Sequence, residues 1–235
     1  MTIKVYGSLT TVPTRAVVLL CLANNIQYEL VEVDLAKLEQ QTPEFKALNP
    51  AGQVPVLDDD GFILPESTAI LRYLAASRHL PDHWFPVDVK ARACVDHLLD
   101  WYHTNIRQTS GYVFEKAFRP RLFKREPDLV AIRLADGKMN SAMDLLEESF
   151  LKAEEGRGPF LLGSSQPCLA DICIACECTQ TRVLSQADQE KIFTGRDKTK
   201  KWLELMEKTL EPHFAEVHKP IDDLFRILEA ARSGN

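Results

Sequence analysis

Residues 51–57 read Ala-Gly-Gln-Val-Pro-Val-Leu, and residues 65–70 read Pro-Glu-Ser-Thr-Ala-Ile. Proline has no backbone N–H, so Pro55 at the mouth of a short apolar run is tolerated only where a strand begins or at a sheet edge. A cis bond before Pro55 would leave the backbone N–H and C=O of Val54 free to pair with an extended peptide. The first stretch therefore predicts a strand that begins beside a peptide-binding groove.

The second stretch predicts the start of a helix. Glu66, Ser67 and Thr68 precede an apolar helical run. A helix N-terminus with free N–H groups and small hydroxyls is a site for a carboxylate, and Glu66 adds a carboxylate that could hold an ammonium. Both stretches would together suit a short peptide with an ammonium and a carboxylate at one end. A strand, a turn and a capped helix without any ligand explain the same residues equally well.

The flanking residues predict a compact α/β unit. Alternating or short apolar runs are typical of strands, and apolar residues at helical spacing after Pro13 indicate a helix to about residue 24. The resulting order, with a second helix at 67–77, predicts a central four-stranded mixed sheet. The expected strands are residues 3–6, 28–34, 54–57 and 62–64.

The composition changes at residues 81–86, Pro-Asp-His-Trp-Phe-Pro, which are typical of a linker. From residue 87 onward strand patterns disappear and helical periodicity takes over. We therefore predict an α/β domain at 1–80 followed by an all-α domain at 87–235. The expected helices are 88–118, 127–153, 168–184, 197–208 and 220–232, with a short turn near 211–218.

Charge and hydropathy narrow the class of protein. A chain of 235 residues that is 45% hydrophobic and 26% charged is typical of a globular protein. The net charge of −6 and the pI near 5.6 argue against nucleic acid as a partner. The chain begins on a strand pattern rather than a signal peptide, and no apolar run reaches membrane-spanning length. We expect a cytoplasmic protein that binds neither nucleic acid nor a membrane.

The six cysteines are expected to be reduced thiols in that compartment. Cys168, Cys173 and Cys176 match the spacing of a plant-type iron–sulfur loop. Such a loop needs a flexible backbone rich in Gly and Ser, whereas residues 168–177 read as a buried helix. We therefore expect these cysteines to pack as small apolar side chains and to bind no metal.

The Val-Pro strand start, the Glu-Ser-Thr helix start and the all-α second half together resemble the soluble glutathione transferases, over essentially the whole chain. The resemblance implies a thioredoxin-like first domain. Residues 12–17, Val-Pro-Thr-Arg-Ala-Val, are similar to the theta class, whose first helix opens Ser-Gln-Pro-Ser-Arg-Ala-Val. Residues 81–86 and 99–107 also look theta-like and resemble the plant members of that class. Cys168 and Asp171 resemble the capping box of the family, with a cysteine in place of the usual hydroxyl residue.

The resemblance implies a donor that activates a thiol. A free thiol has a pKa of about 8.5, and lowering it by about two units requires roughly 2.7 kcal/mol. A hydroxyl close to a helix N-terminus can supply this stabilisation. In the theta class the donor is a serine before the first helix, and the matching residue is Thr11, with Thr10 and Ser8 as alternatives. The absence of a cysteine from this loop argues against the thiol-transferase branches.

The same resemblance implies how glutathione binds. Glu66 is expected to hold the γ-glutamyl ammonium, and Ser67 the adjacent carboxylate. Val54 is expected to pair through its backbone with the cysteinyl unit. The amides expected to meet the glycyl carboxylate are those of Gln40 and Gln53, with Gln41 a weaker candidate.

The electrophile is expected against the helical domain. Arg107 lies in a run that resembles the theta substrate wall, and the aromatic residues Tyr112, Phe114 and Phe118 follow it. Two alternatives stay open: aromatic residues at helical spacing often belong to a core, and Arg107 could pair with a local acid. His103 is expected to be structural.

The sequence therefore predicts a homodimeric glutathione transferase of theta type that binds no metal. It would take glutathione as its cosubstrate, conjugate it to apolar electrophiles and reduce organic hydroperoxides. Because Thr11 replaces a serine, a second hypothesis is a glutathione-binding carrier of apolar ligands with little or no turnover. A third, an interaction module within a larger assembly, is disfavoured because the chain carries no extra domain or long charged tail.

Overall fold

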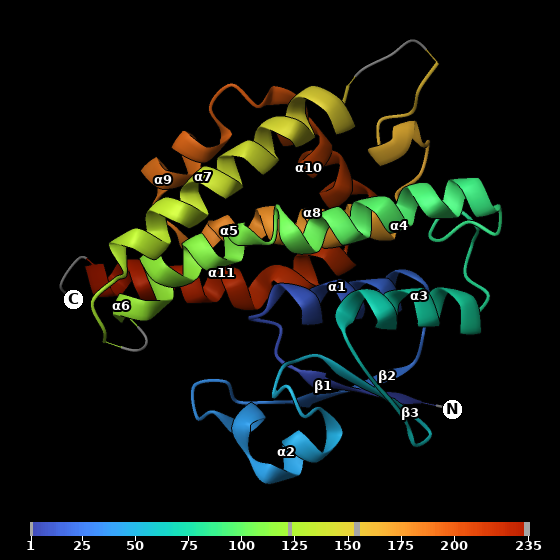
Figure 1. Ribbon diagram of the computed structural model, residues 1–235, viewed down its shortest axis with the longest axis horizontal. Coiled ribbons are helices and arrows are strands. Elements are labelled where there is room, and N and C mark those ends of the chain that lie inside the picture. Colours follow the sequence, from blue (N-terminus) through green and yellow to red (C-terminus); the bar gives the residue numbers. More distant parts are fainter. Residues whose placement is uncertain (1, 122–123, 153–155, 233–235) are drawn as a thin grey trace.

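The computed structural model describes residues 2–121, 124–152 and 156–232 (Figure 1). A four-stranded sheet lies in the N-terminal part, in the order β2-β1-β3-β4. Strand β1 pairs parallel with β2 and antiparallel with β3, and β3 pairs antiparallel with β4, which confirms the mixed sheet. The strands are β1 (Ile3–Gly7), β2 (Tyr28–Glu32), β3 (Val56–Asp59) and β4 (Phe62–Pro65).

Helices cover both faces of this sheet (Figure 1). Helices α1 (Val12–Ala23) and α3 (Ser67–Ser77) lie on one face, and α2 (Pro43–Leu48) lies on the other, after a short 3-10 turn at Glu39–Gln41. Successive side chains of a strand point to opposite faces. Accordingly, Leu57 belongs to the main core beneath α1 and α3, whereas Val56 packs with Phe45 of α2.

Strand β3 begins two residues later than the sequence predicts. The Val54–Pro55 peptide bond is cis, and the strand starts at Val56 and runs on to Asp59. It extends that far because Asp60 and Gly61 alone make the hairpin turn, both with positive φ, as two-residue hairpins require. Val54 therefore precedes the strand and is not part of its ladder.

The rest of the chain is helical within the described residues, which confirms an α/β thioredoxin-like domain followed by an all-α domain. Helix α8 lies at the centre of the second domain, and every one of its residues is buried. The helices are α4 (Val89–Thr104), α5 (Gln108–Val113), α6 (Arg119–Arg121), α7 (Leu129–Leu145), α8 (Leu169–Thr179), α9 (Gln186–Phe193), α10 (Asp197–Thr209) and α11 (His213–Arg232). Short π segments at Phe114–Phe118 and Leu146–Phe150 follow α5 and α7, and 3-10 turns stand at Leu161–Gly163 and Gln180–Val183.

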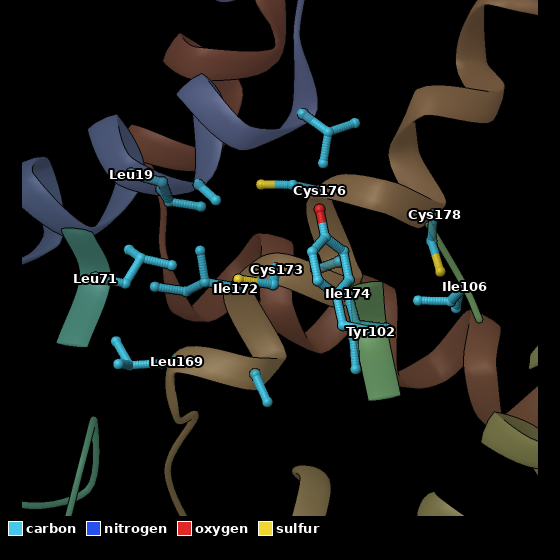
Figure 2. Close-up of a cluster of buried hydrophobic side chains, with 14 of the residues drawn as sticks. Leu19, Leu71, Tyr102, Ile106, Leu169, Ile172, Cys173, Ile174, Cys176 and Cys178 are labelled. Atoms are coloured by element: carbon cyan, nitrogen blue, oxygen red, sulfur yellow. The ribbon is translucent and has the colours of Figure 1, made fainter. Parts of the chain in front are cut away.

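The central core joins the two domains (Figure 2). Leu19 of α1 and Leu71 of α3 pack with Ile172 of α8 in one cluster of fully buried side chains. Cysteines of α8 fill the same cluster as small apolar groups, and burial raises the pKa of the Cys176 thiol to about 12. In the part of the chain that the structure describes, no group of three or more His, Cys, Asp or Glu side chains is arranged to hold a metal.

Two of the expected helices differ from the structure in their bounds. The predicted helix 88–118 breaks at Asn105, because the side-chain amide of Asn105 donates to the carbonyl of Trp101 and its backbone leaves the helical region. The last helix begins at His213 instead of 220, since its buried face continues unbroken through Pro220. The predicted end of the helix 127–153 falls partly on residues 153–155, outside the described residues.

Helix α9 has no counterpart in the sequence prediction. The sequence nevertheless contains a pattern for its start. The hydroxyl of Ser185 accepts a hydrogen bond from the backbone N–H of Asp188, three residues later. A Ser-x-x-Asp spacing of this kind indicates the start of a helix.

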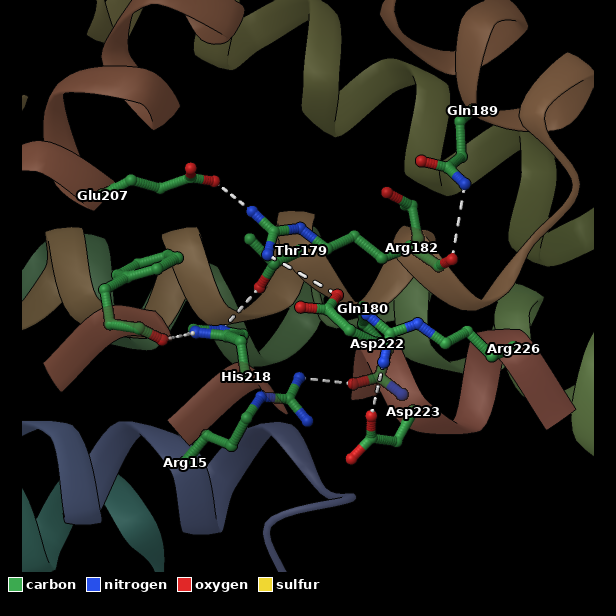
Figure 3. Close-up of polar contacts among 12 residues, drawn as sticks. Arg15, Thr179, Gln180, Arg182, Gln189, Glu207, His218, Asp222, Asp223 and Arg226 are labelled. Atoms are coloured by element: carbon green, nitrogen blue, oxygen red, sulfur yellow. Dashed lines mark hydrogen bonds and ion pairs between the residues drawn. The ribbon is translucent and has the colours of Figure 1, made fainter. Parts of the chain in front are cut away.

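A buried polar cluster lies where α1 meets α8 and α11 (Figure 3). Arg15 has no exposed surface and donates to the side-chain oxygen of Gln180 and to the backbone carbonyls of Cys176 and Leu9. Beside it, His218 contacts the Thr179 hydroxyl through Nε2 at 2.8 Å and the Phe214 carbonyl through Nδ1 at 2.8 Å. The bonds of Arg15 to Cys176 and Gln180 join the first domain to the second, whereas those of His218 hold α11 against α8.

We expect the free energy of unfolding to fall as the pH drops below about 6.5, the usual pKa of histidine. Burial, and then the charge of Arg15, lower the pKa of His218 well below that value. The unfolded chain therefore binds a proton that the folded chain does not, so stability rises with pH in this range. Between pH 7.5 and 5.5 the loss from this residue is about 1.4 kcal/mol.

Urea unfolding at the two pH values measures this loss. The matched control is His218→Gln, whose stability should lack that increment of pH dependence. If the wild type and His218→Gln show the same difference between pH 7.5 and 5.5, the assignment to His218 is wrong.

Candidate functional site

A cleft of about 380 Å³ lies between the N-terminal domain and the end of α4. It brings together seven residues that the sequence predicts for the site. These are Thr11, Gln40, Gln53, Val54, Glu66, Ser67 and Arg107. The cleft is also lined by Pro13, Leu35, Asn49, Gly52, Pro55 and His103, which the sequence prediction does not assign to ligand binding.

Thr11 lies at the N-cap of α1, in extended backbone, and faces the cleft. Its hydroxyl donates to the Ser8 carbonyl at 2.9 Å and to the Thr14 hydroxyl at 2.8 Å. One hydroxyl carries one proton, so these two acceptors share it. The Ser8 and Thr10 hydroxyls bond to each other at 3.1 Å, and neither residue lines the cleft. Of the three candidate donors, Thr11 is therefore the one placed at the cavity.

The loop before α1 is held by Arg15. Nη1 of Arg15 donates to the carbonyl of Leu9 at 2.9 Å, while Nη2 of the same guanidinium bonds to α8 and the residue after it. A planar guanidinium can serve several acceptors at once in a fixed geometry. The backbone just before Thr11 is thus tied to the core of the helical domain.

The backbone before β3 is open toward the cleft. Neither the N–H nor the C=O of Val54 has a hydrogen-bond partner among the described residues. Asn49 shapes this segment, because its amide donates to the Gln53 carbonyl at 2.8 Å and accepts from the Ala51 N–H at 3.1 Å. The Asn-Pro dipeptide at 49–50 is typical of a turn, and that pattern could have pointed to Asn49.

Of the two neighbouring glutamines, Gln40 faces the cleft and Gln41 packs against Gly52. Gly52 has a φ of +61°, and a Cβ there would come within 2.8 Å of Gln41 Nε2. Gln41 instead donates to the Gly52 carbonyl at 3.1 Å and does not line the cleft. Gln40 lines the cleft, and its buried Oε1 has no hydrogen-bond partner in the described residues. An amide oxygen left unpaired in a cleft is suited to a polar ligand.

Glu66 and Ser67 stand at the N-terminus of α3. Glu66 has a φ of +72°, in a region that side chains other than glycine rarely adopt. Such conformations cost about 1–3 kcal/mol and cluster at ligand sites. Ser67, the first residue of the helix, is almost fully buried at the floor of the cleft. A carboxylate and a helix N-terminus thus lie side by side, as the sequence predicts.

His103 lines the cleft from the helical domain. Its Nε2 lies 3.1 Å from the Thr68 hydroxyl. Burial lowers the pKa of His103, and the charge of Glu66 opposes this effect. The contact with Thr68 joins α4 to the first turn of α3, which fits the structural role expected from the sequence.

Arg107 shows both features that the sequence left as alternatives. It lines the cleft, and its Nη1 pairs with Glu177 at 3.2 Å. The aromatic residues lie elsewhere: Tyr112 is buried beside Lys116, and Phe114 meets Phe118 edge to face. None of these three aromatic residues lines the cleft.

Known proteins are similar to this chain in sequence and in fold. Residues 1–76 match the family model of the glutathione S-transferase N-terminal domain. Glutathione S-transferase T1 of Arabidopsis thaliana is 38% identical over 97% of this chain and 91% of its own length, and theta-1 of Rattus norvegicus is 33% identical over 94% and 89%. A human theta-class glutathione transferase, solved with the glutathione conjugate of 1-menaphthyl sulfate, superposes with a TM-score of 0.86 at 31% identity, over 99% of this chain and 92% of that one.

No helix in the described residues is long and apolar enough to cross a bilayer. The cleft at the start of α1 and α3, the thioredoxin-like domain beside it and these relatives lead to one assignment. The chain belongs to the theta class of the glutathione S-transferases, on the side of the plant enzymes, and is a glutathione transferase.

Proposed function

We propose that the Thr11 hydroxyl stabilises the thiolate of glutathione in the cleft. The observation that carries this proposal is the position of the hydroxyl, at the N-cap of α1 and facing the cavity. Its proton is shared between Ser8 and Thr14, and rotation about the Cβ–Oγ bond would turn it toward a sulfur. The positive end of the α1 dipole adds to the stabilisation of an anion there.

The remaining cleft residues would hold the rest of glutathione. The proposal gives Glu66 the γ-glutamyl ammonium and Ser67 the adjacent carboxylate. Val54 would pair through its free backbone groups with the cysteinyl unit. The amides of Gln40 and Gln53 would meet the glycyl carboxylate as neutral donors. The unpaired backbone groups of Val54 support this orientation.

The electrophile would enter on the side of Arg107. The thiolate would attack an apolar electrophile, form a carbon–sulfur bond and expel the leaving group with its electron pair. A guanidinium at the cleft wall suits an anionic leaving group, and the human relative was solved with the conjugate of a sulfate ester. The proposal rests on Arg107, because Tyr112, Phe114 and Phe118 lie outside the cleft; those aromatic residues would meet only a substrate that extends beyond it.

Reduction of organic hydroperoxides would use the same thiolate. Its sulfur would attack the terminal peroxide oxygen, so that an S–O bond forms, the O–O bond breaks and the alkoxide leaves as an alcohol after protonation. A second glutathione would attack the resulting sulfenic acid, giving the disulfide and water. This sequence needs only glutathione as the reductant.

The proposal extends to the setting of the enzyme. It places glutathione binding in residues 1–80 and substrate binding in residues 87–235, in a cytoplasmic homodimer. All six cysteines are free thiols, as is typical of proteins in a reducing compartment. The rival function, a glutathione-binding carrier with little turnover, keeps the same cleft but needs no activated thiolate.

Ultraviolet absorbance of the bound thiolate as a function of pH separates the two functions. We expect a thiol pKa for bound glutathione about two units below the free value, together with conjugation of an apolar electrophile. If glutathione binds with an unshifted thiol pKa and conjugation does not exceed the uncatalysed rate, the carrier function holds instead.

Replacing Glu66 by glutamine should weaken glutathione binding by roughly tenfold or more, because a charge-assisted hydrogen bond contributes about 1.5–3 kcal/mol. The shape of the side chain is kept, so kcat at saturating glutathione should change little. Isothermal titration with glutathione measures the affinity. Glu44→Gln, in the first turn of α2 and outside the cleft lining, is the matched control. An unchanged dissociation constant for Glu66→Gln would remove Glu66 from the ammonium site.

A further inference from the structure

A fully buried carboxylate lies behind the cleft wall. Glu177 stands in the last turn of α8 and has no exposed surface. Burial raises the pKa of Glu177, and the charge of Arg107 opposes that effect. A carboxylate in such a place is costly unless several donors satisfy it. Its donors are the N–H of Ser110 at 2.7 Å, Nη1 of Arg107 at 3.2 Å and the hydroxyl of Tyr102 at 3.4 Å.

These donors stand on both sides of the break after α4. Tyr102 belongs to the last turn of α4, whereas Ser110 belongs to the first turn of α5. Arg107 occupies the N-cap of α5 and has no side-chain oxygen to cap that turn. Glu177 accepts the N–H that a capping side chain would otherwise accept. One carboxylate therefore fixes the end of one helix and the start of the next.

The same carboxylate orients the guanidinium of Arg107. Only Nη1 of Arg107 has a protein partner among the described residues, and about a third of the side chain is exposed, at the cleft. Burial disfavours the charge of Arg107, but the charge and hydrogen bond of Glu177 together with Tyr102 outweigh it, so the pKa of Arg107 is raised above its usual value. The remaining N–H groups of this planar fork are left for a group in the cleft.

We propose that Glu177 is a positioning residue, which holds Arg107 so that its free N–H groups receive the charge on an oxyanion leaving group such as sulfate. The inference rests on the proposed function of Arg107. Glu177 makes no hydrogen bond to the described residues of the thioredoxin-like domain. Its loss should therefore leave glutathione binding and the thiol pKa unchanged and slow only the expulsion of the leaving group.

Two benzylic electrophiles that differ only in the leaving group test this inference. In both, the carbon–sulfur bond forms as the leaving group departs with its electron pair. Sulfate has oxygens that accept from the guanidinium, whereas chloride has none. For Glu177→Gln we expect kcat with the sulfate ester to fall roughly tenfold or more, as for loss of a charge-assisted contact, and kcat with the chloride to stay within about threefold.

A double-mutant cycle shows whether the residue acts through Arg107. Arg107→Met should show the same selective loss, and the double variant should be no slower than Arg107→Met alone. The matched control is Tyr102→Phe, which removes another donor from the same carboxylate and should leave the ratio of the two rates unchanged.

Several outcomes overturn the inference. A uniform loss with both electrophiles, or effects that add in the double variant, would make Glu177 merely structural. Thermal unfolding shows whether Glu177→Gln is folded, and if it is not, Glu177→Asp takes its place with the same selective loss expected. If Arg107→Met turns over the sulfate ester at the wild-type rate, the role of Arg107 fails and the inference with it. Failure of the Thr11 proposal is seen separately, as an unshifted thiol pKa in the wild type.

Discussion

Replacement of Thr11 by valine should lower kcat/KM for glutathione conjugation at pH 6.5 by roughly five- to eightfold. Loss of the hydroxyl returns the thiol pKa from about 6.5 to about 8.5, so the thiolate fraction falls about 50-fold at that pH. A more basic thiolate is a better nucleophile, with a Brønsted slope of about 0.4–0.5, and this offsets part of the loss. The two rates should therefore cross at about pH 7.5, and the variant should be the faster of the two at about pH 9, where both thiols are ionised.

The pH profile of kcat/KM, together with the ultraviolet titration of bound glutathione, measures this effect. Valine keeps the β-branched shape of Thr11, so the variant tests the hydroxyl alone. Thr11→Ser is the matched control, because it keeps the hydroxyl and restores the theta-class residue; it should retain the depressed pKa. A depressed pKa that survives in Thr11→Val would transfer the role to Thr10, Ser8 or the helix terminus.

Replacement of Asp171 by alanine should destabilise the fold by about 3–5 kcal/mol, because each buried donor left without a partner costs about 1–3 kcal/mol. The carboxylate has no exposed surface and accepts from the N–H of Cys168 at 2.9 Å, the N–H of Leu161 at 3.0 Å and the indole of Trp202 at 2.9 Å. Alanine would leave these donors buried without a partner. For a chain of this size the midpoint of thermal unfolding should fall by roughly 10 °C.

Circular dichroism during heating measures that midpoint. Asp223→Ala removes a more exposed carboxylate from α11, where its ion pairs with Lys219 and Arg226 lie at the surface, and should shift the midpoint by less than about 2 °C. If Asp171→Ala unfolds within that same margin of the wild type, the buried capping network does not carry the expected stability.

The fold of the N-terminal domain could be predicted from the sequence because short stretches of it restrict the backbone locally. Pro13, Pro55 and the Asp60-Gly61 turn each restrict the backbone at their own position, so the strands and the helix at 67–77 follow from short stretches of sequence. The placement of seven predicted residues around one cleft follows from the same short motifs. Their individual roles stay predictions, since position in a cleft does not measure binding or rate.

The helical domain was less predictable because distant residues decide its boundaries. The helix that starts after the break at Asn105 is capped by Glu177, some seventy positions away, which accepts from the N–H of Ser110 in the first turn of α5. Pro220 suggested a helix start, yet packing of Phe214, Val217 and Ile221 in the core carries the helix across it. The spacing of apolar residues along the sequence does not indicate such long-range partners. It does not indicate that Leu35 lines the cleft either.

The guanidinium of Arg15 ties the two domains together, so one domain cannot be exchanged without changing this contact. It joins the backbone before Thr11 to Gln180 and to the Cys176 carbonyl. A chimera that combined this N-terminal domain with the helical domain of another transferase would keep every cleft residue of the first domain. Arg15 would nevertheless lose its side-chain acceptor unless the new domain offered an amide at the position of Gln180. Domain shuffling within the family is therefore constrained by a contact that lies outside the cleft.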